Sequence, residues 1–214
     1  MKKNLILIFA LILLLSACAG KPEEPTGPQT LTVMTHDSFA ISDEVLAAFE
    51  AEHNVTVTFI RSGDTGSAVN AAVLAVGKPL ADVFYGVDNT FLSRALDEGI
   101  FEAYDAPLLA EIPDDFKLDD KNRALPVDFG DVCLNYDLVY FEEHDLPVPT
   151  HLDDLLKPEY AGLVAVPNPA SSSPGLGFLY ATLGFYGGEG YLDFWQGLVN
   201  NDVKVVNDWE TVYY

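Results

Sequence analysis

The feature that most constrains the fold is a regular alternation of strand-like and helical segments between residues 31 and 99. Short runs rich in Val, Thr and Phe alternate with longer stretches whose apolar residues recur at helical spacing. In chain order the segments are a strand at 31–35, a helix capped by Ser42, a strand at 55–60, a helix capped by Ser67 and ended by Gly77 and Pro79, a strand at 82–86 and a helix at 89–98. This order predicts an α/β fold with a mostly parallel, doubly wound sheet.

A second block of similar character begins near Leu125. Ser173 followed by Pro174 is typical of a helix start, with serine as the cap and proline at the first helical position. The predicted elements are strands at 131–136, 162–167 and 203–206, and helices at 152–156, from Ser173 onward and at about 189–199. We therefore expect two successive α/β blocks without internal repeats.

The acidity of the chain limits its partners. Its 33 Asp and Glu against 11 Lys and Arg give a net charge of −22, which argues against nucleic acid because phosphate binding needs a clustered basic face. With 49% hydrophobic residues, the 214-residue chain still suits one domain or two small lobes. Its two cysteines are too few for a disulfide framework or a metal cluster. Cys133, within the predicted strand, is interpreted as a small buried apolar residue.

The N-terminus has the pattern of an export signal. Lys2 and Lys3 precede an apolar run at 5–15, which is too short to span a bilayer, so residues 1–17 are predicted to be a signal peptide. Residues 15–18, Leu-Ser-Ala-Cys, resemble the bacterial lipobox, which implies lipidation of Cys18; cleavage beside an unrelated cysteine is the alternative. The proline-rich segment 18–30 is expected to be a flexible tether.

No catalytic motif is complete. Asp64-Thr-Gly-Ser67 matches the aspartic-protease string, but that chemistry needs two aspartates and the string occurs once. His36-Asp37-Ser38 contains the three triad residue types, yet neighbours on a strand point to opposite faces, so no proton relay is expected.

Acids that could pair for glycoside hydrolysis are Asp82, Asp88, Asp128 and Asp131, and chance proximity is expected among so many acidic residues. Asp114, Asp115, Asp119 and Asp120 lack the calcium-loop pattern and are interpreted as an exposed turn. The chain is therefore predicted to bind a ligand rather than to be an enzyme, with no cofactor or metal.

Five segments together resemble the thiamine-binding proteins of ABC importers. They are 31–39 (LTVMTHDSF), 81–89 (ADVFYGVDN), 126–130 with 135–137 (PVDFG, NYD), 171–177 (SSSPGLG) and 207–209 (NDW). The resemblance implies the type II periplasmic binding fold, in which two α/β lobes joined by a hinge enclose a ligand cleft. It places lobe 1 at 31–126, without its C-terminal return segment, and lobe 2 at 127–214. Because such receptors are longer than this chain, we expect the second lobe to be incomplete.

The same resemblance implies the site residues. Asp64 matches a cleft carboxylate that faces the cation or the aminopyrimidine, and Trp209 matches a ligand-contacting tryptophan. Ser172 matches a loop serine that, with Ser173 and Gly175, contacts a phosphate or hydroxyl. His36 stands where relatives carry tyrosine, so a protonated imidazole would weaken cation binding at low pH. Tyr213 and Tyr214 are similar to the tyrosine pairs of iron-binding relatives. Against these roles, Asp64, Ser172 and Ser173 could only cap helices, and Trp209 could belong to the lobe core.

The expected function is that of a monomeric, lipid-anchored, extracytoplasmic receptor. It would capture thiamine, or its phosphates, and deliver it to the permease of an ABC importer. A permanent cation suits carboxylates and aromatic faces, and a phosphate suits a helix N-terminus. The alternatives are a receptor for a polyamine or ferric iron, or a secreted carboxylate-type hydrolase.

Overall fold

A computed structural model describes residues 27–214, so the predicted signal peptide, Cys18 and most of the tether lie outside the described residues. The chain divides into two compact units. Among the described residues, the first comprises 27–31 together with 42–57, and the second comprises 32–41 together with 58–214. No helix among the described residues is long and apolar enough to cross a membrane.

The helix of the first unit begins where the sequence predicts. Helix α2 (Asp43–His53) follows Ser42, whose Oγ accepts the backbone N–H of Val45 at 3.3 Å. Asp43 and Glu44 occupy the first turn, where carboxylates complement the helix dipole. The helix ends at Asn54, which adopts the left-handed conformation with φ of 51°. The predicted cap at Ser42 is therefore confirmed.

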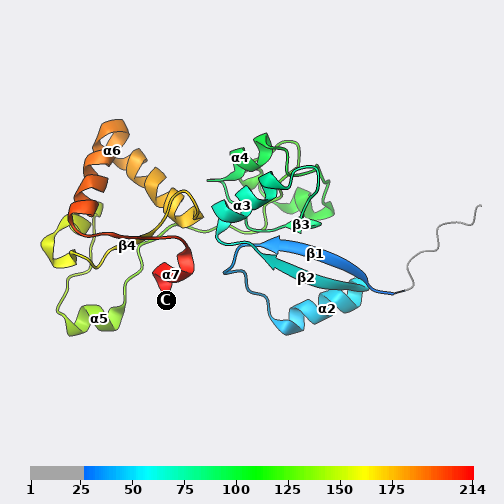
Figure 1. Cartoon of the computed structure of the whole chain (residues 1–214), viewed down its shortest axis with the longest axis horizontal. Coiled ribbons are helices and arrows are strands. Elements are labelled where there is room, and N and C mark those ends of the chain that lie inside the picture. The colour runs from blue at the N-terminus through cyan, green and yellow to red at the C-terminus, as the bar shows by residue number, and fades with distance from the viewer. Residues whose placement is uncertain (1–26) are drawn as a thin grey trace, which may run out of the picture. The chain divides into compact units, whose positions relative to one another are not determined.

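Three strands form the first sheet, in the order β2-β1-β3 (Figure 1). They are β1 (Gln29–Thr35), β2 (Val55–Arg61) and β3 (Val83–Phe84). β1 and β3 run parallel, with Val33 opposite Val83. This order, in which the first strand lies between the second and the third, is that of a doubly wound sheet and confirms the predicted α/β class.

Helices α3 (Thr65–Leu74) and α4 (Leu92–Asp97) belong to the second unit. Val69 of α3, Ala95 of α4 and Phe91, the residue just before α4, form a buried core against which Phe84 of β3 packs. The prediction that Ser67 caps α3 is wrong. The N-cap lies three residues earlier, at Asp64, whose carboxylate accepts the N–H of Thr65 at 2.7 Å.

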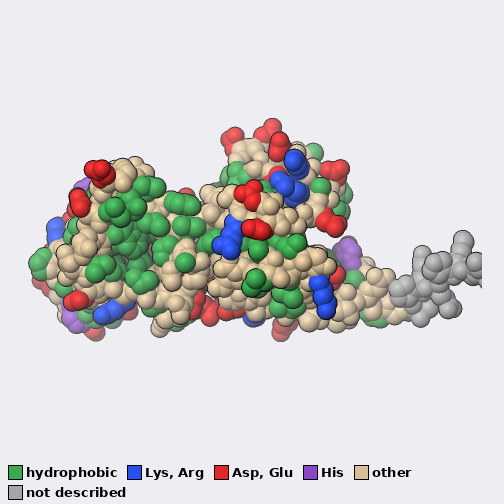
Figure 2. All heavy atoms as spheres, turned by 45° about the horizontal axis from the view of Figure 1, so that its top comes forward, with side chains coloured by type: hydrophobic (Ala, Val, Ile, Leu, Met, Phe, Trp, Pro, Cys, Tyr) green, Lys and Arg blue, Asp and Glu red, His purple; other side chains and the backbone are tan. Residues whose placement is uncertain are grey.

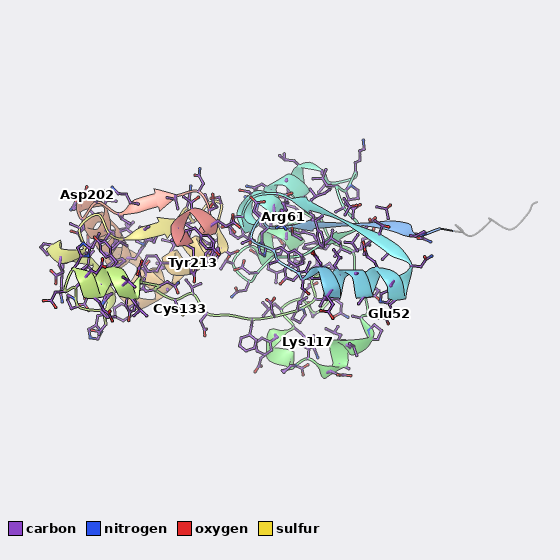
Figure 3. All side chains as sticks on the ribbon, turned by 90° about the horizontal axis from the view of Figure 1, so that it is seen from below. Glu52, Arg61, Lys117, Cys133, Asp202 and Tyr213 are labelled. Atoms are coloured by element: carbon purple, nitrogen blue, oxygen red, sulfur yellow. The ribbon has the colours of Figure 1, made fainter. Side chains whose placement is uncertain are left out.

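The segment between the two sheets differs most from the prediction. Residues 131–136 form no strand, because no strand of the described chain pairs with them, and Val132 and Leu134 are exposed. Cys133 is exposed as well, so its predicted burial is wrong (Figure 3). Short helices occur here instead: η2 (Pro107–Glu111), η3 (Asp114–Phe116) and α5 (Leu138–Glu143), the last capped by Asp137.

One predicted exposed acid of this segment is buried. The side chain of Asp119 is 3% exposed and pairs with the guanidinium of Arg123 at 2.7 Å. This hydrogen bond holds the pKa of Asp119 at about 2. The neighbouring Asp114 is exposed, as predicted.

The second sheet consists of β4 (Ala165–Pro167) and β5 (Lys204–Val206), which run parallel. The helices η4 (Leu152–Leu156) and η5 (Pro158–Tyr160) precede β4, and the long helix α6 (Ser173–Asn200) follows β4 and leads to β5. The last helix, α7 (Trp209–Tyr213), contacts both strands (Figure 1). The predicted elements of this block are largely confirmed, but α7 was not predicted.

Helix α6 joins two helices that the sequence predicts separately, with a break at Gly187 (φ 77°, ψ −179°). Its N-cap is Ser172, one residue before the predicted cap. Phe178, Phe194 and Leu198 pack in a buried core with residues of η4 and β4. Hydrophobic side chains also gather on the surface in the region of α6, where Tyr180 and Phe185 are exposed (Figure 2).

Candidate ligand-binding site

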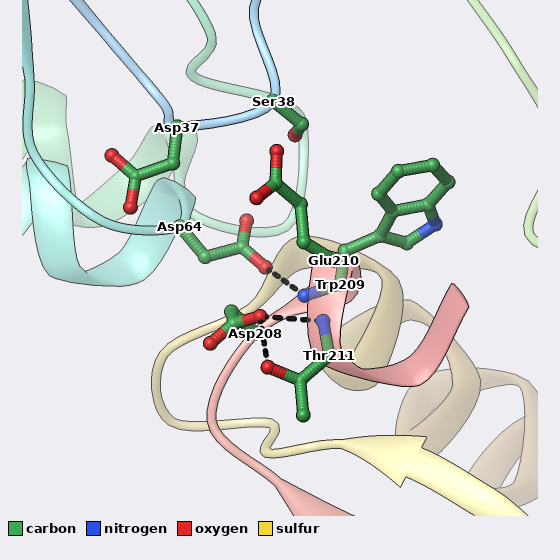
Figure 4. A pocket seen from close by; sticks show the side chains of 7 residues that line it. All are labelled: Asp37, Ser38, Asp64, Asp208, Trp209, Glu210 and Thr211. Carbon is green, nitrogen blue, oxygen red and sulfur yellow. Dashed lines mark hydrogen bonds between the residues drawn. The ribbon is translucent and has the colours of Figure 1, made fainter. Parts of the chain in front are cut away.

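A pocket of about 180 Å³ lies in the second unit, where several strands end (Figure 4). Its lining follows β1, β2 and β5, and consists of Asp37, Ser38, Asp64, Asp208, Trp209, Glu210 and Thr211. In α/β folds, ligands bind outside the carboxyl ends of parallel strands. The position of this pocket therefore makes it the candidate binding site of the described chain.

The side chain of Asp64 hydrogen-bonds to the first residues of two helices beside the pocket. Its Oδ1 accepts the N–H of Thr65 at the start of α3, and its Oδ2 accepts the N–H of Trp209 at the start of α7, at 3.1 Å (Figure 4). One carboxylate thus satisfies the first backbone donors of two helices, which are otherwise left without partners.

The other carboxylates are held by local hydrogen bonds. Oδ1 of Asp208 accepts both the N–H and the hydroxyl of Thr211 at 2.8 Å, and the backbone bond is the main cause that lowers the pKa of Asp208. Oδ1 of Asp37 accepts the N–H of Gly63 at 2.9 Å. Glu210 makes no side-chain hydrogen bond to the described residues, and its carboxylate points toward Ser38 and Asp64 (Figure 4).

Three aromatic side chains, those of Trp209, Tyr213 and Tyr214, pack on one another in and just after α7. The indole of Trp209 stacks on Tyr213, with ring centres 4.6 Å apart and planes at 18°. Tyr214 meets both rings edge-on. Tyr213 is half exposed, so this aromatic surface remains open to solvent. Carboxylates next to aromatic faces are the groups that bind organic cations.

The structure brings together some of the predicted site residues. Asp64 and Trp209 line the pocket, and Tyr213 stacks on Trp209. His36 is not among the lining residues. Its Nδ1 is 3.0 Å from the hydroxyl of the lining residue Ser38, and its ring centre is 6.0 Å from that of Tyr85.

Ser172 and Ser173 are not part of the lining. They are 0% and 9% exposed, and neither hydroxyl has a hydrogen-bond partner among the described residues. The carbonyl of Ser171, just before them, accepts the N–H of Gly66 at 2.8 Å, which joins the start of α6 to α3.

Contrary to the prediction from the sequence, the segment His36 to Ser38 is not part of a strand. β1 ends at Thr35, and Ser38 lies in the turn that follows, where its hydroxyl is 3.0 Å from Nδ1 of His36. The triad is nevertheless incomplete within residues 27–214, because no carboxylate hydrogen-bonds the imidazole of His36. The neighbouring Tyr85 donates its hydroxyl to Asp128 at 2.6 Å, a bond that raises the pKa of Tyr85 to about 12.

Sequence reasoning missed Asp208, Glu210 and Thr211, and it did not propose Asp37 and Ser38 as ligand contacts. The available signal was Asp208 followed three residues later by Thr211, directly after a strand, which is an N-cap pattern. Among the described residues, no group of three or more His, Cys, Asp and Glu side chains is arranged to hold a metal ion. Three carboxylates of the pocket, those of Asp37, Asp64 and Asp208, accept backbone N–H groups.

The chain is similar to known proteins in sequence and in fold. The family described as bacterial extracellular solute-binding protein matches residues 78–210. The thiamine-binding periplasmic protein of Brucella suis biovar 1 (strain 1330) is 29% identical over 212 residues, covering 96% of this chain and 59% of that protein. The chain therefore spans less than two thirds of this relative's length.

Two solved structures have a similar fold. A periplasmic thiamin binding protein aligns with a TM-score of 0.65 and 26% identity, over 91% of this chain and 60% of its own. Iron-bound HitA from Pseudomonas aeruginosa aligns with a TM-score of 0.66 at 20% identity, over 87% and 58%. These similarities confirm both the predicted resemblance and the type II periplasmic binding fold.

Proposed function

Because the chain belongs to the family of bacterial extracellular solute-binding proteins, we propose that its pocket captures thiamine. The observation that carries this proposal is that four acidic residues and Trp209 line one pocket. Thiamine contains a permanently cationic thiazolium ring next to an aminopyrimidine. Carboxylates balance such a charge, and aromatic faces attract it. The similarity to thiamine-binding periplasmic proteins supports the same ligand.

The binding step we propose is closure on the ligand. Asp37 and Asp64 belong to the proposed lobe 31–126, whereas Asp208 to Thr211 belong to the proposed lobe 127–214. A ligand that contacts both groups stabilises the arrangement in which they face one another. The bond from Trp209 N–H to Asp64 supports this view, because it already joins the two groups.

The wider role we propose is that of a monomeric receptor outside the cytoplasm that hands thiamine to an ABC importer. Its signal peptide would be residues 1–17, and Cys18 would carry the lipid anchor. Cys18→Ser tests the anchor: in a bacterial host, the variant should leave the membrane fraction and appear in the soluble extracytoplasmic fraction. Retention in the membrane would contradict lipidation at this residue.

Thiamine is favoured over the alternatives for specific reasons. The similarity to HitA is at 20% identity and shows the fold alone. A linear polyamine would use the carboxylates but has no aromatic ring to stack on Trp209. A hydrolase needs a relay, and the His36–Ser38 pair has no orienting carboxylate within the described chain.

A thermal melt of the full chain tests the proposal. It compares no ligand with excess thiamine, putrescine or ferric citrate. At one hundred times the dissociation constant, a bound ligand adds about 2.7 kcal/mol to the free energy of unfolding and raises the midpoint. We expect this rise with thiamine. A rise only with putrescine or ferric citrate, or no rise at all, would overturn thiamine capture.

A further inference from the structure

We propose that Arg61 is a positioning residue of the pocket: it does not line the pocket itself, but it holds the turn that carries Asp37 and Ser38 in place beside Asp64. This inference rests on the proposed function, and it adds a residue on which thiamine binding would depend. Arg61 is the last residue of β2 and the turn follows β1, so both belong to the second unit of the chain.

The guanidinium of Arg61 bonds to the turn through backbone carbonyls. Its Nη1 donates to the carbonyl oxygen of Asp37 at 2.6 Å and to that of Phe39 at 2.7 Å. These two carbonyls lie on either side of Ser38, whose hydroxyl is 3.0 Å from Nδ1 of His36. Hydrogen bonds from a charged donor are stronger than those between neutral groups, so one side chain fixes the backbone on both sides of a pocket residue.

The same turn is joined to the loop that leads to Asp64. The N–H of Asp37 donates to the carbonyl oxygen of Gly63 at 2.9 Å, and the N–H of Gly63 donates to Oδ1 of Asp37, also at 2.9 Å. Because Gly63 directly precedes Asp64, these bonds hold two acidic residues of the lining next to one another. Arg61 lies two residues before Gly63, so its bonds to the turn complete the connection between β2 and the end of β1.

The charge of Arg61 and its hydrogen bonds should act on thiamine binding in opposite directions. A positive charge near the pocket repels a cationic ligand, so by charge alone the loss of Arg61 should strengthen binding. Its side chain forms none of the ion pairs between described residues, which involve Lys117, Arg123 and Lys157. A site that is already ordered binds more tightly, so the loss of its hydrogen bonds should weaken binding. The sign of the change therefore separates the two roles.

Calorimetric titration of the full chain with thiamine measures this sign. Arg61→Ala should raise the dissociation constant about tenfold, because the turn then has to be ordered when the ligand binds. The matched control is Arg94→Ala, which removes one positive charge from an exposed position on α4 outside the pocket. It should leave the constant within about twofold, because salt screens a distant exposed charge. Circular dichroism at the titration temperature checks that both variants are folded.

A second measurement locates the change in the chain without any ligand. Amide hydrogen exchange followed by NMR should show a loss of protection at Asp37 and Gly63 in Arg61→Ala, because local opening exposes their N–H groups. The N–H of Asn168, which donates to a carbonyl of β5 at 2.7 Å, should keep its protection. A contribution of Arg61 to overall stability would instead lower protection at all three amides.

The other outcomes distinguish this inference from the proposed function. Unchanged or tighter thiamine binding in Arg61→Ala would overturn the positioning role while leaving thiamine capture intact. An equal loss of affinity in Arg94→Ala, or an equal loss of protection at Asn168, would show that the effect is not specific to the turn and would overturn it as well. Absence of thiamine binding by the unmodified chain would overturn the proposed function itself, whereas the exchange measurement would still decide whether Arg61 holds the turn.

Discussion

The carboxylate of Asp64 accepts the backbone N–H of Trp209 at 3.1 Å, although the two residues are 145 positions apart in the sequence. The same carboxylate caps α3 through Thr65. Because Asp64 also lines the pocket, the residue that we propose to face the ligand is also the one that organises the helices around it. Structural and ligand-binding roles therefore have to be separated by experiment.

Removal of the Asp64 carboxylate should affect both stability and binding. Asp64→Ala loses an N-cap and the bond to Trp209, so the free energy of unfolding should fall by about 1–2 kcal/mol, and thiamine affinity should fall at least about tenfold. Asp137→Ala is the matched control, because Asp137 caps α5 outside the pocket. It should lose about 1 kcal/mol without a change in affinity. Urea unfolding and calorimetry measure the two quantities; unchanged affinity in Asp64→Ala would remove Asp64 from the site.

Because the chain has two tryptophans, fluorescence of single-tryptophan variants can show where thiamine binds. Trp209 lines the pocket, whereas Nε1 of Trp195 donates to the hydroxyl of Thr182 in α6 and its ring packs on Phe178. Thiamine should quench the fluorescence of the Trp195→Phe variant and leave that of Trp209→Phe nearly unchanged. Quenching that persists in Trp209→Phe would place the ligand elsewhere.

Truncation of the indole should weaken binding as well. Trp209→Ala removes a cation–π partner whose contribution is about 0.5–2 kcal/mol, so the dissociation constant for thiamine should rise between about twofold and thirtyfold. Circular dichroism checks that the variant remains folded. Affinity equal to that of the unmodified chain would show that the indole does not contact the ligand.

Two glycines of α6 should respond in opposite directions to alanine. A Cβ at Gly175 would overlap the carbonyl oxygen of Pro167, so Gly175→Ala must shift α6 away from β4 and should cost about 1–3 kcal/mol. Gly184 has open space around its Cβ position, and Gly184→Ala should add up to about 1 kcal/mol through helix propensity. Urea unfolding checks both; destabilisation of similar size in both variants would contradict the close contact between α6 and β4.

The ion pair between Asp119 and Arg123 predicts a contribution to acid stability. The pKa of Asp119 is about 2 in the folded chain and about 3.9 in the unfolded chain, so its stabilisation is present above about pH 4 and is lost as the pH falls through 2. Asp119→Asn should therefore reduce the slope of unfolding free energy against pH between about pH 4 and 2. Asp120→Asn, at an exposed neighbour, should keep the slope of the unmodified chain.

Elements specified by local chemistry could be predicted from the sequence. Ser42 followed by two acids is sufficient to start α2, and short β-branched runs are sufficient for β1 and β2. The strand predicted at 131–136 was wrong because alternation of Val132 and Leu134 indicates an amphipathic segment but supplies no neighbouring strand. A strand depends on its ladder partner, and that information is not local.

The candidate site was predictable only in part for the same reason. Asp64 and Trp209 followed from the resemblance, but the bond between them depends on the fold that brings α3 and α7 together. Helix α7 has five residues, too few to show a helical period. Burial of Ser172 and Ser173 likewise depends on packing against α3, which a helix-start pattern does not encode.

Equilibrium dialysis of the full chain against isotope-labelled thiamine tests the central claim most directly. Our account predicts saturable binding of one thiamine per chain. Unlabelled thiamine should displace the label, and Asp64→Ala should weaken binding far more than Asp137→Ala does. If no saturable binding occurs, or if both alanine variants bind as the unmodified chain does, the pocket around Asp64 and Trp209 is not a thiamine site.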